Sequence, residues 1–486
     1  MRRLAGPWRD RAPPRAGIIA AAALLASCAV GPDYRRPAAQ VPPDWQPRPV
    51  WQQAVPGDAA LKGEWWQLFR DPQLDDLVRR ALAGNQTLLI AATRLQQARA
   101  QLTISEAALY PQLDLDAAAA RAKTSSNRPL SNYTVPNAAT VQNDFKLNPA
   151  VSYEADLFGA VRRDVEAARA TAGQAQADFE NARLILVAEL LSDYFTLREL
   201  DAEIDVVRQS IDAQRRALEL ISTRHEMGFA TGLDLAEQQA LLEASSSQLE
   251  LLKNQRAQSE HAIATLVAVP APSFTLQPAV AAMTVPVLPV GLPSDLLQRR
   301  PDVASAERAM AAANARIGVA RAAYFPMIEL LSVGGWESNM LATLLNAPSR
   351  FWSLGASAAQ TVFDAGRTRA NVRIATAGYE AAVAGYRQTV LTAMEEVENG
   401  ITGLAALSRA GELADASVHS AQHAYDIANE RYSGGVDTFL DVFTTQQTLL
   451  SDQRAAVQIR GQQVLTAVYL VKALGGGWEG MAARGG

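Results

Sequence analysis

The chain has 486 residues, a formal net charge of −5 at pH 7 and a single cysteine. One cysteine excludes an internal disulfide framework, and mild acidity argues against nucleic acid as a partner. Hydrophobic residues make up 49% of the chain but aromatic residues only 6%, so the composition favours helices in close contact through small side chains over one thick core.

The N-terminus is typical of an exported lipoprotein. Residues 1–27 contain several arginines and then an apolar run at 17–26, which is too short to span a bilayer and predicts a signal peptide. The small residues before Cys28 match a bacterial lipobox, so we expect Cys28 to carry a covalent lipid and to be the first mature residue. No other cofactor is expected, and no later stretch is apolar enough for a membrane-spanning helix.

Residues 28–84 are predicted to form an extended N-terminal anchor segment followed by a first short helix. Several prolines keep the start of this segment extended. Its four tryptophans are expected to pin the segment along the outside of the helical body, with a ligand site as the lesser alternative. They are Trp45, Trp51, Trp65 and Trp66.

The rest of the chain contains an internal duplication. Tyr110 and the proline after it correspond to Phe325 and its proline, and Phe158 corresponds to Phe363, 205 residues later. Matched blocks in the same order predict a duplicated unit, each copy being a helix, two strands and two long helices. The first repeat is placed at 85–293 and the second at 294–486.

Alternation of apolar and polar residues predicts two strands in each repeat. The strands of the first repeat are expected at about 111–123 and 141–157, with a polar loop between them. Those of the second repeat are expected at about 326–337 and 350–363, where the alternation is weaker.

Heptad spacing of apolar residues predicts long coiled helices after each strand pair. A glycine turn joins each helix pair, at Gly228 and at Gly435, and Thr231 or Asp437 can cap the helix that follows. Glutamine and charged side chains opposite the apolar seams, such as Asp212 and Gln446, face either outer solvent or an enclosed duct. The helices are placed at about 160–226, 231–268, 301–323, 366–432 and 437–474, with a connector at 269–293 and a C-terminal tail.

Four strands cannot enter a membrane alone. An open sheet in lipid leaves the N–H and C=O groups of both edge strands without partners, at several kcal/mol each. Several copies must therefore share one barrel: two copies give eight strands, and three give twelve, which leaves more room for a lumen.

With its lipobox, its repeats and the pattern Arg-Tyr-x-x-Gly-x-x-Thr-x-Leu-Asp-Val from Arg431 to Val442, the chain resembles TolC-type outer membrane efflux lipoproteins, the NodT-like branch that serves resistance-nodulation-division pumps. The resemblance implies a mainly α fold with a membrane β-barrel. Tandem-duplicated long helices would form a periplasmic α-barrel, and four strands per chain would join a shared 12-stranded barrel in a homotrimer. Implied partners are a periplasmic adaptor protein, an inner-membrane pump and outer-membrane lipid.

The resemblance also assigns roles to the two helical hairpins. Their turns would be the adaptor-contact tips, and Asp437 and Asp441 would ring the constriction, where three copies of one carboxylate attract cations. The alternative is that Asp437 only caps the last helix and that Asp441, like Asp234 in the first hairpin, marks a helix start. The residues assigned to the tips are Arg224, Gly228, Thr231, Arg431, Gly435 and Thr438.

The predicted function is a passive outer-membrane exit duct of a tripartite efflux pump for drugs or other small toxic compounds. The rival readings are a periplasmic coiled-coil scaffold lipoprotein without transport, and an export duct for protein or metal cargo. No catalytic constellation or phosphate loop is evident, so we do not expect an enzyme. His419 and His423 have helical spacing for one metal but lack a third ligand, and no metal site is predicted.

Overall fold

The computed structural model describes residues 30–35, 52–53, 64–127, 140–280, 283–286, 289–290 and 300–476. The signal peptide, Cys28, Trp45 and Trp51 lie outside these residues. The chain divides into two compact units. Unit 1 comprises residues 1–36, 97–172 and 308–383, and unit 2 comprises residues 37–96, 173–307 and 384–486.

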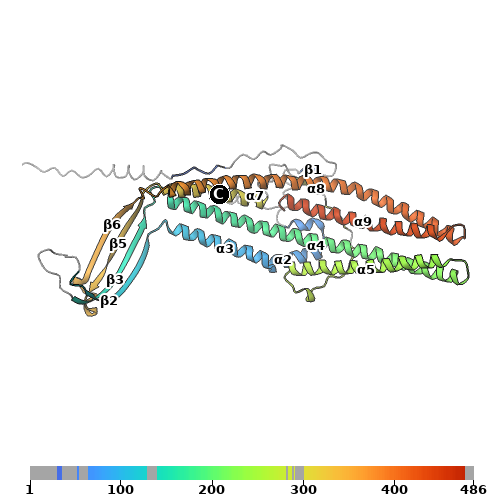
Figure 1. The fold of residues 1–486 in the computed structure, drawn as a ribbon, viewed down its shortest axis with the longest axis horizontal. Coiled ribbons are helices and arrows are strands. Elements are labelled where there is room, and N and C mark those ends of the chain that lie inside the picture. The colour runs from blue at the N-terminus through green and yellow to red at the C-terminus, as the bar shows by residue number, and fades with distance from the viewer. Residues whose placement is uncertain are drawn as a thin grey trace, which may run out of the picture. The chain divides into compact units, whose positions relative to one another are not determined.

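Unit 1 contains a four-stranded antiparallel sheet in the order β2-β3-β5-β6 (Figure 1). The strands are β2 (Gln112–Thr124), β3 (Thr140–Glu154), β5 (Met327–Ser338) and β6 (Arg350–Ala359). The β3–β5 pair joins the two sequence repeats in one sheet, with Tyr153 opposite Leu330. Two short 3-10 turns, Leu341–Thr343 and Ala347–Ser349, lie between β5 and β6.

Two predicted strands are shorter than expected at their C-terminal ends. The strand predicted at 141–157 ends at Glu154, and the one predicted at 350–363 ends at Ala359. The following residues form the turns into the next helices, where Asp156 accepts a bond from the Arg162 backbone N–H at 2.9 Å and Asp364 accepts one from that of Thr368 at 2.8 Å. The period-two pattern therefore continues past the last ladder pair into the turns that lead to the next helices.

The described N-terminal segment, residues 30–35, docks on the helices of unit 1. Val30 donates its backbone N–H to the Phe158 carbonyl at 3.2 Å, Arg163 pairs with Asp33 at 2.9 Å, and Asn314 donates to the Pro32 carbonyl at 3.0 Å. Because Arg163 lies in the first turn of α4 (Ala160–Glu226) and Asn314 lies in α7 (Pro301–Ala322), the segment contacts both repeats.

In the same place, Gly31 has φ +124 and lies against a second glycine, Gly318 of α7. A Cβ built on Gly31 would come within 2.7 Å of the Gly318 Cα. Only glycine fits such a close backbone crossing with a positive φ.

Unit 2 holds most of the helical residues. Its parts are η2 (Trp65–Phe69), α2 (Pro72–Gly84), α5 (Gly232–Leu266), η3 (Ala271–Ser273), α9 (Phe439–Ala473) and the ends of α4 and α8 (Arg367–Ser433), while α3 (Gln86–Ala107) begins here. A two-residue parallel pair joins β1 (Gln52–Gln53) to β4 (Pro289–Val290). Among the described residues, no helix combines the length and apolarity needed to cross a membrane.

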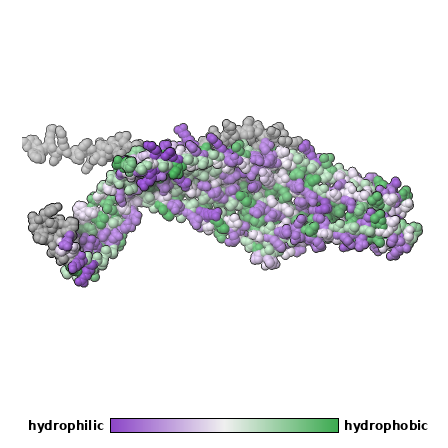
Figure 2. Space-filling model, in the orientation of Figure 1, coloured by the Kyte–Doolittle hydropathy of each residue, from purple (hydrophilic) through white to green (hydrophobic). Residues whose placement is uncertain are grey.

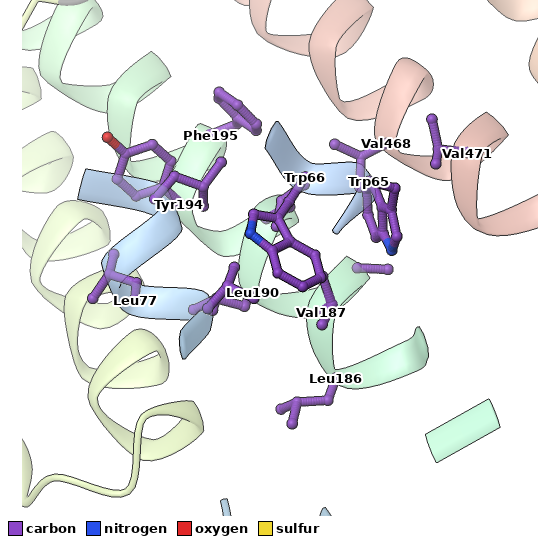
Figure 3. Close-up of a cluster of buried hydrophobic side chains, with 14 of the residues drawn as sticks. Trp65, Trp66, Leu77, Leu186, Val187, Leu190, Tyr194, Phe195, Val468 and Val471 are labelled. Atoms are coloured by element: carbon purple, nitrogen blue, oxygen red, sulfur yellow. The ribbon is translucent and has the colours of Figure 1, made fainter. Parts of the chain in front are cut away.

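The largest core cluster of unit 2 is built around the N-terminal tryptophans (Figure 3). Trp65 and Trp66 are 3% and 2% exposed and share the cluster with Leu190 of α4 and Val468 of α9. The expectation that these two tryptophans pin the segment to the helical body is therefore confirmed. They hold the segment by full burial between helices, because flat aromatic surfaces bury large apolar areas.

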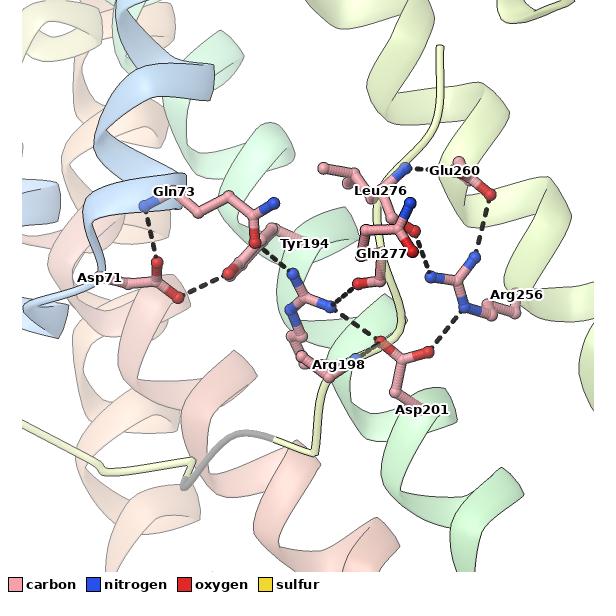
Figure 4. A network of polar contacts seen from close by, with 10 residues as sticks. Asp71, Gln73, Tyr194, Arg198, Asp201, Arg256, Glu260, Leu276 and Gln277 are labelled. Atoms are coloured by element: carbon pink, nitrogen blue, oxygen red, sulfur yellow. Dashed lines mark hydrogen bonds and ion pairs between the residues drawn. The ribbon is translucent and has the colours of Figure 1, made fainter. Parts of the chain in front are cut away.

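A buried polar network ties α2, α4, α5 and the connector after η3 together (Figure 4). Asp201 pairs with Arg198 at 2.8 Å and with Arg256 at 2.6 Å, and it also accepts a bond from the Ala279 backbone N–H. Arg256 donates to the Leu276 carbonyl at 2.7 Å, and Tyr194 donates to Asp71 at 2.5 Å. Two guanidinium groups thus share one carboxylate, which compensates their burial.

Candidate functional site

The first hairpin turn joins α4 to α5. Gly228 has φ +79, and the next backbone N–H, from Phe229, donates to the Arg224 carbonyl at 2.8 Å, which closes the helix end. Thr231 then caps α5: its hydroxyl accepts from the Asp234 N–H at 3.2 Å, and the Asp234 carboxylate accepts from the Thr231 N–H at 2.9 Å. This is the reciprocal capping box that holds a tight turn.

The second hairpin turn joins α8 to α9 and begins in the same way. Gly435 has φ +72, and the Val436 N–H donates to the Arg431 carbonyl at 3.0 Å. The start of α9 differs from that of α5, because the Thr438 side chain caps no backbone N–H and its hydroxyl donates to Asp441 Oδ2 at 3.0 Å.

Asp437 is not the N-cap residue of α9, which corrects the capping role considered from the sequence, although its Oδ1 accepts a hydrogen bond from the Thr438 backbone N–H at 3.1 Å. Thr438 is the N-cap residue and the helix begins at Phe439, two residues later than the predicted start at 437. Asp437 Oδ2 instead accepts from Arg431 Nε at 2.8 Å. That hydrogen bond is the main cause that lowers the pKa of Asp437. Asp437 is therefore ionised and tied to its own turn.

Arg224 links the two hairpin turns. Its guanidinium donates to the carbonyls of Tyr432 and Ser433, both at 3.2 Å, and its Cζ lies 4.7 Å from the centre of the Tyr432 ring. The cation lies at the last carbonyls of α8, where the helix dipole is negative. Hydrogen bonds, the helix dipole and the cation–π contact with Tyr432 therefore all stabilise the position of Arg224.

A small apolar cluster continues this link. Ile221 and Phe439 are almost fully buried and pack with Ala428 and Val442. The Tyr432 ring meets Phe439 edge-on, with 5.6 Å between centroids. The two hairpins are therefore fastened near their turns by apolar packing as well as by Arg224.

The tips themselves expose apolar side chains beyond this cluster. Phe229 is 80% exposed and Val436 is 72% exposed, one in each turn. Further exposed members are Met227, Leu233 and Leu440. Figure 2 shows the hairpin ends as a mixture of apolar and polar surface. Nothing in the described part of one chain covers these apolar side chains at the two turns.

One of the glutamines expected to face water is buried. Gln446 is 4% exposed, whereas Asp212 on α4 is exposed as predicted. Gln446 follows Val442 by four residues and precedes Leu449 by three, so helical spacing places it on the apolar side of α9 with them.

Two carboxyl groups in the middle of α4 are perturbed by their surroundings. Burial, followed by repulsion from Glu203, raises the pKa of Glu199 to about 7. Burial, followed by repulsion from Glu189, raises the pKa of Asp193 to about 6. A Cβ added to Gly461 of α9 would collide with the Glu199 carboxylate, so α4 and α9 approach closely there. Arg454 pairs with Glu203 at 2.7 Å, whereas Glu199 has no ion pair among the residues that the structure describes.

The sheet of unit 1 has two chemically different faces, because successive side chains point to opposite sides. The ladder registers place Leu115, Leu147, Leu330 and Leu354 on one side, called here the apolar face. The other side, called the polar face, carries Asp114, Lys146, Glu329 and Ser357 and, in β5, also the apolar Met327, Leu331 and Val333. Lys146 pairs with Asp144 at 3.1 Å and with Glu337 at 3.5 Å on the polar face. Leu115 is 71% exposed and Leu354 is 76% exposed, so the apolar face is uncovered in one chain.

Comparison with known proteins explains this combination of features. A model of the family described as outer membrane efflux protein matches residues 77–269 and 292–476. The chain belongs to the outer membrane efflux protein family. It therefore acts in efflux at the bacterial outer membrane, and members of this family are channels rather than enzymes.

Individual relatives cover nearly the whole chain. The chain is 32% identical to the pyoverdine export outer membrane protein OpmQ of Pseudomonas aeruginosa, over 95% of this chain and 96% of that one. It is 31% identical to the toluene efflux pump outer membrane protein TtgF of Pseudomonas putida, over 96% and 97%. The solved open state of the MtrE outer membrane channel of Neisseria gonorrhoeae superposes with a TM-score of 0.81 at 26% identity, over 93% and 99%.

These similarities confirm the family recognised from the sequence and the predicted fold class, long duplicated helices with four strands per chain that join a shared barrel. The hairpin residues predicted to act at the tips do lie in or beside the two turns. Sequence reasoning missed that Arg224 reaches across to Tyr432. The Arg-Tyr pattern was visible in the second hairpin, but the partner of Arg224 lies 208 residues away.

In the part of the chain that the structure describes, no group of three or more potential ligands could hold a metal ion. His419 and His423 are both exposed on α8. Two imidazoles alone do not make the closed four-ligand shell of a structural zinc site.

Proposed function

We propose that this protein is the passive outer-membrane exit duct of a tripartite efflux pump and that it has no catalytic activity of its own. The observation that carries the proposal is the sheet. Its apolar face is uncovered, its opposite face is polar, and β2 and β6 each pair on one side only within the described strands. Such a sheet becomes stable in lipid when copies close it into a barrel with the apolar face outward.

Three copies are the proposed assembly, because twelve strands leave a lumen whereas eight are nearly filled by side chains. Cys28 carries the proposed lipid, which would add a second attachment to the outer membrane. The docking of residues 30–35 on α4 and α7 supports this role, since it holds the chain two residues after Cys28. No further cofactor is proposed.

The hairpin turns are the proposed contact with a periplasmic adaptor protein, which would connect the duct to an inner-membrane pump. The exposed side chains of Phe229 and Val436 supply apolar area, and Arg224, Thr231, Arg431 and Thr438 with their glycines Gly228 and Gly435 hold the turns in shape. Asp437 and Asp441 are the proposed constriction carboxylates. Three copies of this pair around one axis would attract cations and repel each other.

Small organic compounds are the proposed cargo. Two relatives are named for the export of pyoverdine and of toluene, a polar and an apolar small molecule. Because relatives of similar sequence are named for different compounds, we assign selection to the pump rather than to the duct.

Single-channel recording in planar bilayers tests the proposal. The purified protein should give discrete, ohmic openings, and deletion of its gene should sensitise a strain without parallel ducts to dyes or solvents. A protein that inserts but never conducts, in a strain whose drug sensitivity is unchanged by the deletion, would favour a lipid-anchored scaffold instead.

A further inference from the structure

The two repeats of one chain meet through an aromatic stack at the base of the sheet. Phe158, just after β3, stacks on Phe325, just before β5, with 4.8 Å between centroids and 15° between the ring planes. Beside the stack, the Ala155 N–H donates to the Ile328 carbonyl at 2.8 Å. Within the chain, therefore, the end of one strand and the start of the next are joined by two stacked rings as well as by the ladder.

Each ring of this stack has a counterpart in the other repeat. Phe363 follows the end of β6 by four residues, as Phe158 follows the end of β3. Tyr110 precedes β2 by two residues, as Phe325 precedes β5. The strand ends of the two repeats thus coincide when the sequence blocks are aligned.

These counterparts have no such contact in one chain. Phe363 is 87% exposed, its neighbour Val362 is 95% exposed, and Tyr110 is 71% exposed. β6 and β2 are also the two edges of the four-stranded sheet. Each edge strand therefore has an exposed ring at the position where β3 and β5 have a stacked one. Among the described residues, the strand pairing and the ring stack of the β3–β5 junction are both missing at these edges.

We propose that a second copy of this chain completes the junction. β6 pairs antiparallel with β2 of the partner subunit, and Phe363 stacks on Tyr110 of the partner subunit as Phe158 stacks on Phe325. This inference rests on the proposed shared barrel, and it adds the residues and the register of the contact between copies.

The repeat fixes the register of the new pair. Tyr153 lies opposite Leu330 in the β3–β5 ladder. In the alignment of the two repeats, Tyr153 corresponds to Ala358 and Leu330 corresponds to Leu115. The equivalent pair between copies is therefore Ala358 opposite Leu115 of the partner subunit. Ala358 and Leu115 both belong to the apolar face, so the two copies continue one apolar surface. A slip by one residue would place an apolar face beside a polar one.

The register also gives a barrel of ordinary geometry. Following the ladders from β2 through β3, β5 and β6 and across the inferred pair returns to β2 six residues further along. With a rise of about 3.3 Å per residue and about 4.8 Å between strands, a shift of six residues over four strands gives a tilt of about 45°. Membrane barrels have tilts of about 35–45°.

Disulfide trapping in the membrane tests the register. The variant that combines Ala358→Cys with Leu115→Cys should form crosslinks between copies on mild oxidation, seen as dimers and trimers in denaturing gels. The matched control combines Ala356→Cys with Leu115→Cys, which keeps the same face but shifts the register by two residues, and it should crosslink at least tenfold less. Each single-cysteine variant serves as a control for disulfides that an introduced cysteine forms with Cys28.

The outcomes separate this inference from the proposed function. A chain that stays monomeric and does not conduct contradicts the shared barrel itself. A conducting oligomer that crosslinks through the shifted pair, or through neither pair, leaves the duct intact and overturns the inferred register.

The aromatic stack has its own test. Phe363→Ala and Tyr110→Ala should each lower the temperature at which the oligomer dissociates in detergent, and the double variant should be no worse than the more damaging single one, because both remove the same contact. Val362→Ala is the matched control beside the stack. Additive losses from the two substitutions would show that the rings do not touch and would contradict the proposal.

Discussion

Arg224 of the first hairpin stacks over the ring of Tyr432 in the second, at 4.7 Å, while it donates to the Tyr432 carbonyl. One side chain thus joins the ends of two hairpins from different repeats. The contact combines charge, helix dipole and an aromatic ring. Its removal should loosen both turns.

The first prediction concerns this link. Arg224→Ala should speed hydrogen exchange of the turn residues 225–231 and 433–438 by roughly 5- to 30-fold, which corresponds to about 1–2 kcal/mol for a cation–π contact with charged hydrogen bonds. Arg224→Lys should lie in between, because an ammonium keeps the charge but not the two-pronged geometry. Arg208→Ala, an exposed arginine on the same helix, should leave both turns unchanged. Equal exchange rates in the Arg224 and Arg208 variants would refute the link.

The second prediction concerns Asp437. If three copies of this carboxylate line a constriction, Asp437→Asn should move the reversal potential in a salt gradient toward zero, since cation preference is lost. If Asp437 only holds Arg431, the substitution should speed exchange in the second turn and leave the reversal potential unchanged. Asp441→Asn provides the companion measurement one helical turn further along.

The pH dependence of this preference follows from the direction of the pKa shift. The pKa of Asp437 is lowered from its usual 3.8, chiefly by Arg431, so the carboxylate stays charged at every pH above that value. The reversal potential of the unmodified protein should therefore be constant between pH 5 and pH 8. A titration within that window would assign the preference to another group.

The third prediction concerns the buried network around Asp201. Asp201→Ala leaves Arg198, 2% exposed, and Arg256 without their shared carboxylate. Loss of one partner from a buried ion pair costs about 3–5 kcal/mol, so denaturant unfolding of the helical part should shift clearly to lower concentration. Asp212→Ala removes an exposed pair with Arg215 on the same helix and should cost less than about 1 kcal/mol. Similar losses in both variants would mean that the network is not stabilising.

The fourth prediction concerns Glu199, whose pKa is raised from 4.5 to about 7. Between these values the folded state holds a proton that the unfolded state has lost, so stability falls as pH rises from about 4.5 to about 7. Glu199→Gln should stabilise the protein at pH 8 by about 1–2 kcal/mol, after allowance for partial solvent screening, and should have no effect at pH 4. Glu219→Gln, exposed on the same helix, serves as the control. A pH-independent effect of Glu199→Gln would contradict the assigned cause.

Much of the local structure could be predicted because it depends on neighbours in the sequence. The cap formed by Thr231 and the glycine turns at Gly228 and Gly435 follow from residue types within a few positions. The repeat, read from matched blocks around Phe158 and Phe363, gave the same order of elements in both halves.

Features that depend on contacts between distant segments could not be read in this way. The ends of β3 at Glu154 and of β6 at Ala359 depend on where the facing strand ends. The burial of Gln446 and of Trp65 depends on which helices pack around them, and the partner of Arg224 lies in the other repeat. In each case the local sequence pattern fits more than one arrangement, and contacts with distant segments determine which arrangement forms.

In the proposed assembly, identical chains pool their strands around one lumen. Native mass spectrometry of the protein, extracted from the outer membrane in detergent, measures how many chains each particle contains. We expect three chains per particle. A particle of one chain that is stable and keeps its sheet intact would rule out the shared barrel.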